Sequence, residues 1–89
     1  MKKTIIARHR VGNIDTWLKG HHERESLFAP AVSGFKTFQD TNDSNSIALV
    51  IEVTDMEKFK AILNDPKNQG IKDNHTVLEP ITISSQVDL

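Results

Sequence analysis

Hydrophobic and polar positions repeat along this chain with two different periods. Residues 3–11 alternate at every second position, and the stretch after them repeats every three or four residues. Two more alternating stretches follow on either side of a polar segment, then a second helical stretch and a last alternating one. Alternation is typical of strands, and a spacing of three and four is typical of amphipathic helices. The pattern therefore predicts strand, helix, strand, strand, helix, strand, with residues 1–89 as one domain.

The predicted strands can be placed in a sheet by their composition. Residues 47–53 are apolar on nearly both sides, which is typical of a central strand. The last strand, predicted over 76–87, contains Pro80, which favours an edge because proline lacks the amide for a ladder. Both positions agree with a ferredoxin-like α+β fold, whose four-stranded antiparallel sheet has the order 4-1-3-2 and two helices on one face.

Capping residues mark the two predicted helices. Asn13 can cap a first helix over about 14–26. Thr54 and Glu57 have the spacing of a capping box at the start of the second, and a helical turn restarts at Asp65–Pro66. Spacing predicts that the first helix turns one stripe inward, consisting of Ile14, Trp17, Leu18, His21 and Glu25.

Composition excludes several classes of protein. The 89 residues include no cysteine, so disulfides, iron–sulfur clusters and thiolate metal sites are excluded. The net charge of −1 provides no basic surface for nucleic acid. The apolar run behind Lys2 and Lys3 ends at Arg8, which predicts no signal peptide and no membrane span, hence a cytoplasmic protein. A domain this small buries only roughly two thirds of the surface that its unfolded chain exposes, so modest stability favours self-association.

Four segments together resemble the dimeric α/β-barrel superfamily: Arg8–Trp17, Gly34–Phe38, Ile47–Val53 and Met56–Phe59. This superfamily includes antibiotic-biosynthesis-type monooxygenases, isomerases, polyketide cyclases, stress-response barrels and many uncharacterised proteins. The resemblance implies a homodimer in which two sheets face each other. It also implies a ligand cavity between sheet and helices in each subunit.

His21 and His9 are the candidate catalytic residues. Glu25 lies one turn after His21, so it can orient that imidazole as a general base. The alternative is an amphipathic helix rim beside a core Trp17. His9 shares a side of its strand with Ile5 and Ala7, where it can carry protons in the cavity or be a hydrogen-bonded core histidine.

No metal site or cofactor is predicted. His21, His22 and Glu25 offer too few ligands, because adjacent histidines diverge by about 100° on a helix. His75 lies in a polar loop and receives no role.

Charged residues are predicted on the other side of the sheet. Arg8, Arg10 and Glu52 share that side, where they would face the partner subunit. They would form an Arg–Glu bridge there or lie near an anionic ligand. The ligand pocket itself is predicted to be bordered by Trp17, His21, Phe35, Phe38 and His9.

Three hypotheses about function follow. The first is a cofactor-independent enzyme, of monooxygenase, isomerase or cyclase type, that uses His9 or His21 as base on a small aromatic or polyketide-like molecule. The second is a non-catalytic, stress-associated or ligand-binding dimer that holds a small apolar molecule. The third is a dimer without a ligand, in which Trp17 and the phenylalanines fill the pocket.

Overall fold

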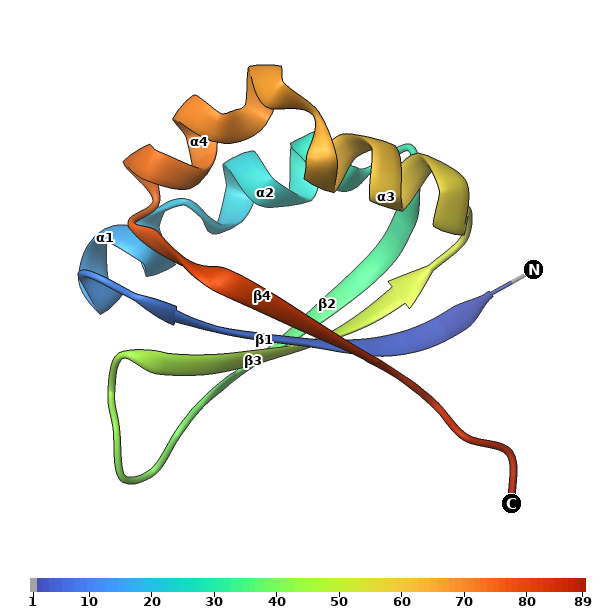
Figure 1. The fold of residues 1–89 in the computed structure, drawn as a ribbon, viewed down its shortest axis with the longest axis horizontal. Helices are drawn as coiled ribbons and strands as arrows, with labels where there is room; N and C mark the ends of the chain where they lie inside the picture. Colours follow the sequence, from blue (N-terminus) through green and yellow to red (C-terminus); the bar gives the residue numbers. More distant parts are fainter. Residues whose placement is uncertain (1) are drawn as a thin grey trace.

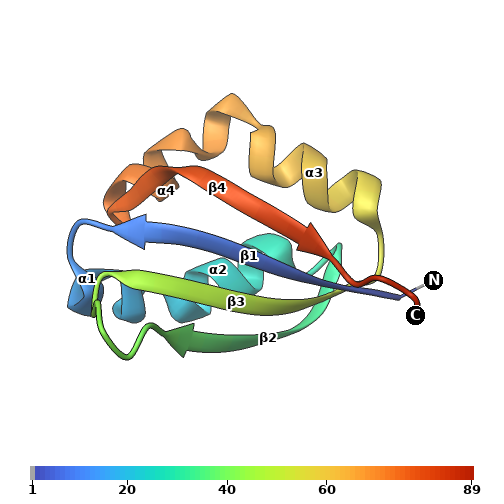
Figure 2. The ribbon, with the colours of Figure 1, turned by 60° about the horizontal axis from the view of Figure 1, so that its bottom comes forward.

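The computed structural model describes residues 2–89 and contains the predicted order of elements (Figure 1). Each predicted helix is divided into shorter segments, and all of them lie on one side of the sheet (Figures 1 and 2). The elements are β1 (Lys3–Val11), α1 (Ile14–Lys19), α2 (His21–Phe28), β2 (Val32–Gln39), β3 (Ser46–Val53), α3 (Met56–Asn64), the 3₁₀ turn η1 (Pro66–Asn68), α4 (Gln69–Asn74) and β4 (Val77–Ser85).

The sheet is antiparallel with the order β2-β3-β1-β4, which confirms the predicted 4-1-3-2 arrangement and the ferredoxin-like α+β fold. Ile51 of β3 lies opposite both Ile5 of β1 and Phe35 of β2, so these three side chains share a face. The central position of β3 is confirmed. So is the edge position of β4, whose register shifts in the segment that contains Pro80.

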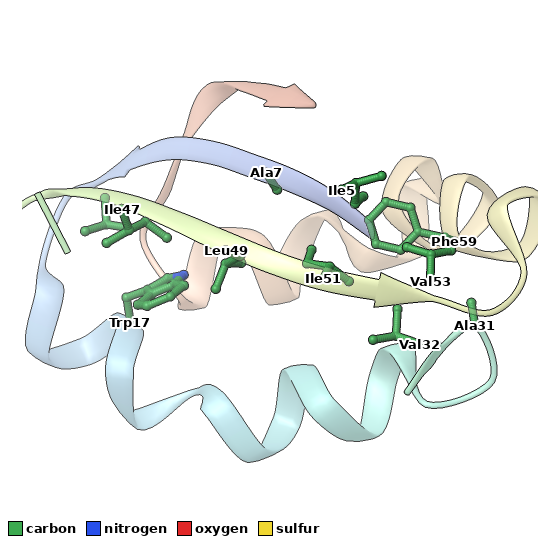
Figure 3. Packing of buried hydrophobic residues seen from close by; sticks show 11 residues of the cluster. Ile5, Ala7, Trp17, Ala31, Val32, Ile47, Leu49, Ile51, Val53 and Phe59 are labelled. Atoms are coloured by element: carbon green, nitrogen blue, oxygen red, sulfur yellow. The ribbon is translucent and has the colours of Figure 1, made fainter. Parts of the chain in front are cut away.

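The hydrophobic core lies between the sheet and the helices, because β1 and β3 turn every second residue toward the helix layer. Trp17 of α1 lies near Ile47 and Leu49, while Phe59 of α3 lies near Val53 at the other end of the core (Figure 3). Trp17 has no exposed surface, and Phe59 is also buried. A buried aromatic ring therefore lies at each end of the core (Figure 3).

The first predicted helix is wrong as a continuous helix. Its start is correct, since Asn13 Oδ1 accepts a hydrogen bond from the Thr16 amide at 3.0 Å. However, α1 ends at Lys19 and α2 begins at His21, with Gly20 as the cap between them. The inward stripe also differs, because Leu18 is 49% exposed and Arg24 is partly buried instead.

The second predicted cap is displaced by one residue. Asp55, not Thr54, caps α3, and its Oδ1 accepts from the Lys58 amide at 3.1 Å. The backbone amides of Thr54 and Asp55 both donate to the Ala31 carbonyl, so neither needs the Glu57 carboxylate of a capping box. The helical restart is confirmed, with Asp65 capping η1 and Pro66 at its start.

The helices cover one face of the sheet and leave the other open (Figure 2). Large apolar side chains from three different strands are exposed on the open face: Ile6 (40%), Phe38 (53%) and Leu78 (47%). Among residues 2–89, no helix has both the length and the apolar character needed to cross a membrane.

Candidate functional site

A cavity of about 70 Å³ lies between the helix layer and the sheet, and its wall is mostly apolar. Trp17 of α1 and Phe28 of α2 contribute to it, as do Phe35 of β2 and Phe59 of α3. Polar groups reach the same cavity, among them His9 and Arg24. Pockets for drug-sized ligands measure roughly 300–1,000 Å³. The cavity in this form therefore suits only a small molecule.

His9 offers a free, unprotonated ring nitrogen at the cavity. Its Nδ1 lies 2.9 Å from the Arg10 carbonyl, which can only accept, so Nδ1 carries the proton. Burial lowers the pKa of His9 below its ordinary value of 6.5, and the charge of Arg24 acts in the same direction. The ring is therefore neutral at pH 7, and its Nε2 has a lone pair. No described residue forms a hydrogen bond with that Nε2.

Arg24 stacks on Trp17, with its guanidinium carbon 3.8 Å from the ring centroid. Its Nη1 donates to the Trp17 carbonyl at 2.7 Å and approaches His75 Nδ1 at 3.2 Å. The guanidinium is therefore fixed from two sides. Trp17 also contacts His9 edge-on, at a centroid distance of 5.9 Å, so both His9 and Arg24 pack against the indole.

His75 is buried, and its two ring nitrogens have different partners. A guanidinium has donors and no acceptor, so His75 Nδ1 must accept from Arg24. The proton then lies on Nε2, which donates to Glu23 Oε1 at 2.6 Å. His75 is held as the Nε2–H tautomer, whereas His9 is the Nδ1–H tautomer.

Thr76 holds the segment that carries His75. Its φ of 58° is in the left-handed region, which costs a β-branched residue about 1–3 kcal/mol. Two hydrogen bonds offset this cost: Thr76 Oγ1 accepts from the Asn13 amide at 3.0 Å and donates to the Asn13 carbonyl at 3.1 Å. These bonds tie the His75 backbone to the loop before α1.

Gly20 provides the space for the His75 ring. A Cβ at position 20 would lie 2.6 Å from two atoms of that ring, which is too close for a van der Waals contact. The φ of Gly20 is −82°, a value that any residue adopts, so only the close approach of His75 requires glycine here.

The structure brings three of the predicted site residues together at the cavity: His9, Trp17 and Phe35. His21 does not line it. Its Nε2 pairs with Glu25 at 3.2 Å as expected, but the pair lies on a surface where the His21 side chain is 41% exposed. His22 approaches the same carboxylate at 3.3 Å, so the two histidines do not diverge as predicted.

The remaining predicted site residues lie on the open face. Phe38 follows Phe35 by an odd number of residues, so it points away from the cavity, and its predicted place at the pocket is wrong. Arg8 and Phe38 instead line a second hollow of about 100 Å³. Within the chain, Arg10 pairs with Asp43 and Glu52 accepts from Thr4 Oγ1 at 2.9 Å. An Arg–Glu bridge to a partner stays a prediction.

Arg24, Glu23 and His75 were missed by the sequence interpretation. Hydropathy selected Leu18 and His21 for the inward stripe because an arginine is rarely assigned to a buried position. The residues at intervals of three and four that would have predicted the inward side are Trp17, Gly20, Arg24 and Phe28. A glycine inside a helical pattern also indicates close packing. The role of His75 had no local signal.

Among residues 2–89, no group of three histidine or acidic side chains is arranged to hold a metal ion.

These features define a ferredoxin-like domain with an apolar cavity beneath its helices, and solved structures share its fold. No protein-family model and no curated protein matches the sequence. The fold is similar to that of antibiotic biosynthesis monooxygenase-like proteins, as the sequence resemblance predicted.

Three such structures illustrate the likeness. SnoaB, a cofactor-independent oxygenase from Streptomyces nogalater, has a TM-score of 0.73 and 14% identity over 99% of this chain and 95% of its own. A putative antibiotic biosynthesis monooxygenase from Bordetella bronchiseptica has a TM-score of 0.75 and 15% identity, over 99% and 97%. One from Nitrosomonas europaea has a TM-score of 0.69 and 12% identity, over 99% and 90%. At identities this low, the structural similarity shows a shared fold and nothing further.

The contact between Gly20 and His75 predicts a difference between two glycine substitutions. Gly20→Ala should lower the free energy of unfolding by about 1–3 kcal/mol, because the new methyl group displaces the His75 ring. Gly70→Ala is the matched control, since its Cβ meets nothing within 4 Å, and it should stabilise α4 by about 0.5–1 kcal/mol. Urea unfolding measures both, and a Gly20→Ala protein as stable as the wild type would contradict the contact.

Burial of His9 predicts a pH dependence of stability. The folded chain binds the His9 proton less readily than the unfolded chain, because burial lowers the folded pKa below 6.5. The contribution of His9 is therefore fully present above pH 6.5 and is lost as the pH falls from there through the folded pKa. Unfolding free energies measured at a series of pH values should fall in this window, and less steeply in His9→Asn. His22→Asn removes a histidine whose side chain is 95% exposed, and it should keep the wild-type slope.

Proposed function

We propose that the protein is a cofactor-independent enzyme of the monooxygenase type, and that its substrate is a small aromatic molecule held in the cavity. The observation that carries this proposal is the free Nε2 of a neutral His9 at an apolar cavity. A neutral imidazole whose other nitrogen is fixed by a carbonyl is suited to accept a proton. The shared fold with a cofactor-independent oxygenase supports the same class.

The reaction begins with proton transfer from an acidic carbon of the substrate to His9 Nε2. The carbanion that remains is electron-rich enough to reduce dioxygen itself. In the overall change a ring methylene becomes a carbonyl, with one oxygen atom of O₂ in the product and the other in water. The substrate supplies all four electrons, so the oxidation balances without another reductant. The apolar wall excludes water from the anion.

His9, rather than His21, is proposed as the base because, of these two histidines, only His9 lines the cavity. His21 is paired with Glu25 at the surface of α2, where a bound molecule in the cavity does not reach it. The two histidines therefore form a matched pair of test positions within one chain.

We further propose that a second copy of the chain covers the open face of the sheet. Ile6 of β1, Phe38 of β2 and Leu78 of β4 are exposed there among polar residues, so three of the four strands contribute apolar side chains to this face. An uncovered apolar surface of this kind is typical of an association site. The assembly would be a homodimer. We also propose that the protein lies in the cytoplasm.

The proton-transfer step can be measured with 2-indanone, whose benzylic methylene protons are acidic. Its hydrogen–deuterium exchange in D₂O, followed by NMR, should be faster with the wild-type protein. His9→Asn should lower the catalysed rate by about 10²–10⁴-fold, the usual contribution of a general base. The asparagine can still donate to the Arg10 carbonyl, which preserves the local hydrogen bond.

His21→Asn is the matched control and should leave the exchange rate unchanged. Equal rates in His9→Asn and the wild type would remove His9 from the mechanism. Oxygen uptake measured in parallel tests the oxidation step. If 2-indanone binds but neither exchange nor oxygen uptake exceeds the uncatalysed rate, the enzyme hypothesis fails and the ligand-binding alternative is favoured.

The dimer proposal predicts different effects for two exposed apolar residues. Phe38→Asp, at a 53% exposed position on the open face, should raise the dimer dissociation constant by at least about tenfold, because it buries a charge at the interface. Leu18→Asp, at a 49% exposed position on α1, should leave it unchanged. Sedimentation equilibrium measures both, and a wild-type monomer at micromolar concentration would contradict the dimer.

A further inference from the structure

Arg24 is a cation at the cavity without a carboxylate partner. None of the ion pairs formed among residues 2–89 includes it. The other cation on the cavity wall, Lys72, pairs with Glu79 at 3.8 Å. Burial lowers the pKa of Arg24 to about 10, so the guanidinium is still charged at pH 7 but is partly desolvated. A partly desolvated cation is stabilised by a nearby anion.

Two side chains of this wall, Arg24 and Trp17, also have hydrogen-bond donors without a partner among the described residues. Nη1 is engaged by the Trp17 carbonyl and His75, whereas Nη2 and Nε of Arg24 have no hydrogen-bond partner among the described residues. The indole Nε1–H of Trp17 is buried and has no acceptor there either. A buried donor without an acceptor costs about 1–3 kcal/mol. A ligand oxygen that reached Nη2 or Nε of Arg24 would supply an acceptor that the described residues do not.

The position of the guanidinium is set before a ligand arrives. Trp17 contacts its flat face, the Trp17 carbonyl holds one nitrogen, and His75 holds the same nitrogen from another side. Glu23 in turn fixes the tautomer of His75. A cation that is already oriented loses little conformational entropy on binding.

We propose that Arg24 binds the anionic oxygen of a small aromatic acid, a carboxylate or a phenolate, whose ring lies against the aromatic side chains of the cavity. This inference rests on the proposed function, because the same cavity must hold the ligand. It adds the substrate class: the cavity selects an aromatic anion over a neutral molecule of the same shape. His9 lies at the same cavity, so the anchored molecule meets both groups.

Benzoate and benzamide test this selectivity, since they have nearly the same shape and differ in charge at neutral pH. Trp17 is the only tryptophan of the chain, so its fluorescence reports binding at this wall. The wild-type protein should bind benzoate about tenfold to a hundredfold more tightly than benzamide, as expected for a hydrogen bond to a charged group. Arg24→Gln should abolish this preference while benzamide still binds.

Lys72→Gln is the matched control, because it removes the other cation of the cavity wall, and it should keep the preference for benzoate within about threefold of the wild-type ratio. In the wild-type protein, benzoate should also shift the NMR signal of Arg24 Nε–H, and benzamide should not. This second measurement remains available if Arg24→Gln fails to fold.

Four results would overturn the inference: equal binding of the two probes, no binding of either, a preference that persists in Arg24→Gln, or an equal loss in Lys72→Gln. Equal binding of both probes would refute the role of Arg24 and leave the cavity as the ligand site. Failure of both probes to bind would refute the cavity as well. A preference for benzoate that depends on Arg24, without exchange of 2-indanone, would support the anion site and refute the role of His9 as base.

Discussion

The ring of His75 packs against Gly20 and accepts a hydrogen bond from Arg24, and the polar end of the cavity depends on this arrangement. The contact explains why a glycine lies where α1 and α2 meet. It also explains why Arg24, rather than an apolar residue, faces the core: Trp17 stacks on the guanidinium, and His75 satisfies one of its nitrogens. Thr76 keeps His75 in place through its two hydrogen bonds to Asn13.

The two buried histidines have opposite tautomers because their partners differ. His9 donates from Nδ1 to a carbonyl, which leaves Nε2 as a base. His75 accepts at Nδ1 from a guanidinium, which places its proton on Nε2 beside Glu23. One histidine therefore provides a lone pair at the cavity, and the other serves to hold the cation. The proposed base and the proposed anion-binding group thus both contact Trp17, His9 edge-on and Arg24 over the face of the ring.

The sheet could be predicted from the sequence because the residues of each strand indicate which of its faces are buried and whether it lies at an edge. Alternation in residues 3–11 and 47–53 and the position of Pro80 depend only on near neighbours along the chain, and they led to the correct order of strands. The same alternation placed His9 on the cavity side. Arg24 and His75 are 51 positions apart, and no local period reports their contact. Phe38 was predicted at the pocket, although the alternation of its strand puts it on the face opposite to Phe35.

The histidine tautomers are the most direct test of this account, because the position of each proton follows from the neighbouring groups alone. Long-range ¹H–¹⁵N correlation spectra of the protein labelled at histidine nitrogens, recorded at neutral pH, distinguish a protonated from an unprotonated ring nitrogen. We predict that His9 carries its proton on Nδ1 and His75 carries its proton on Nε2. A His9 protonated on Nε2, or a His75 protonated on Nδ1, would contradict the proposed base and the proposed anchoring of Arg24.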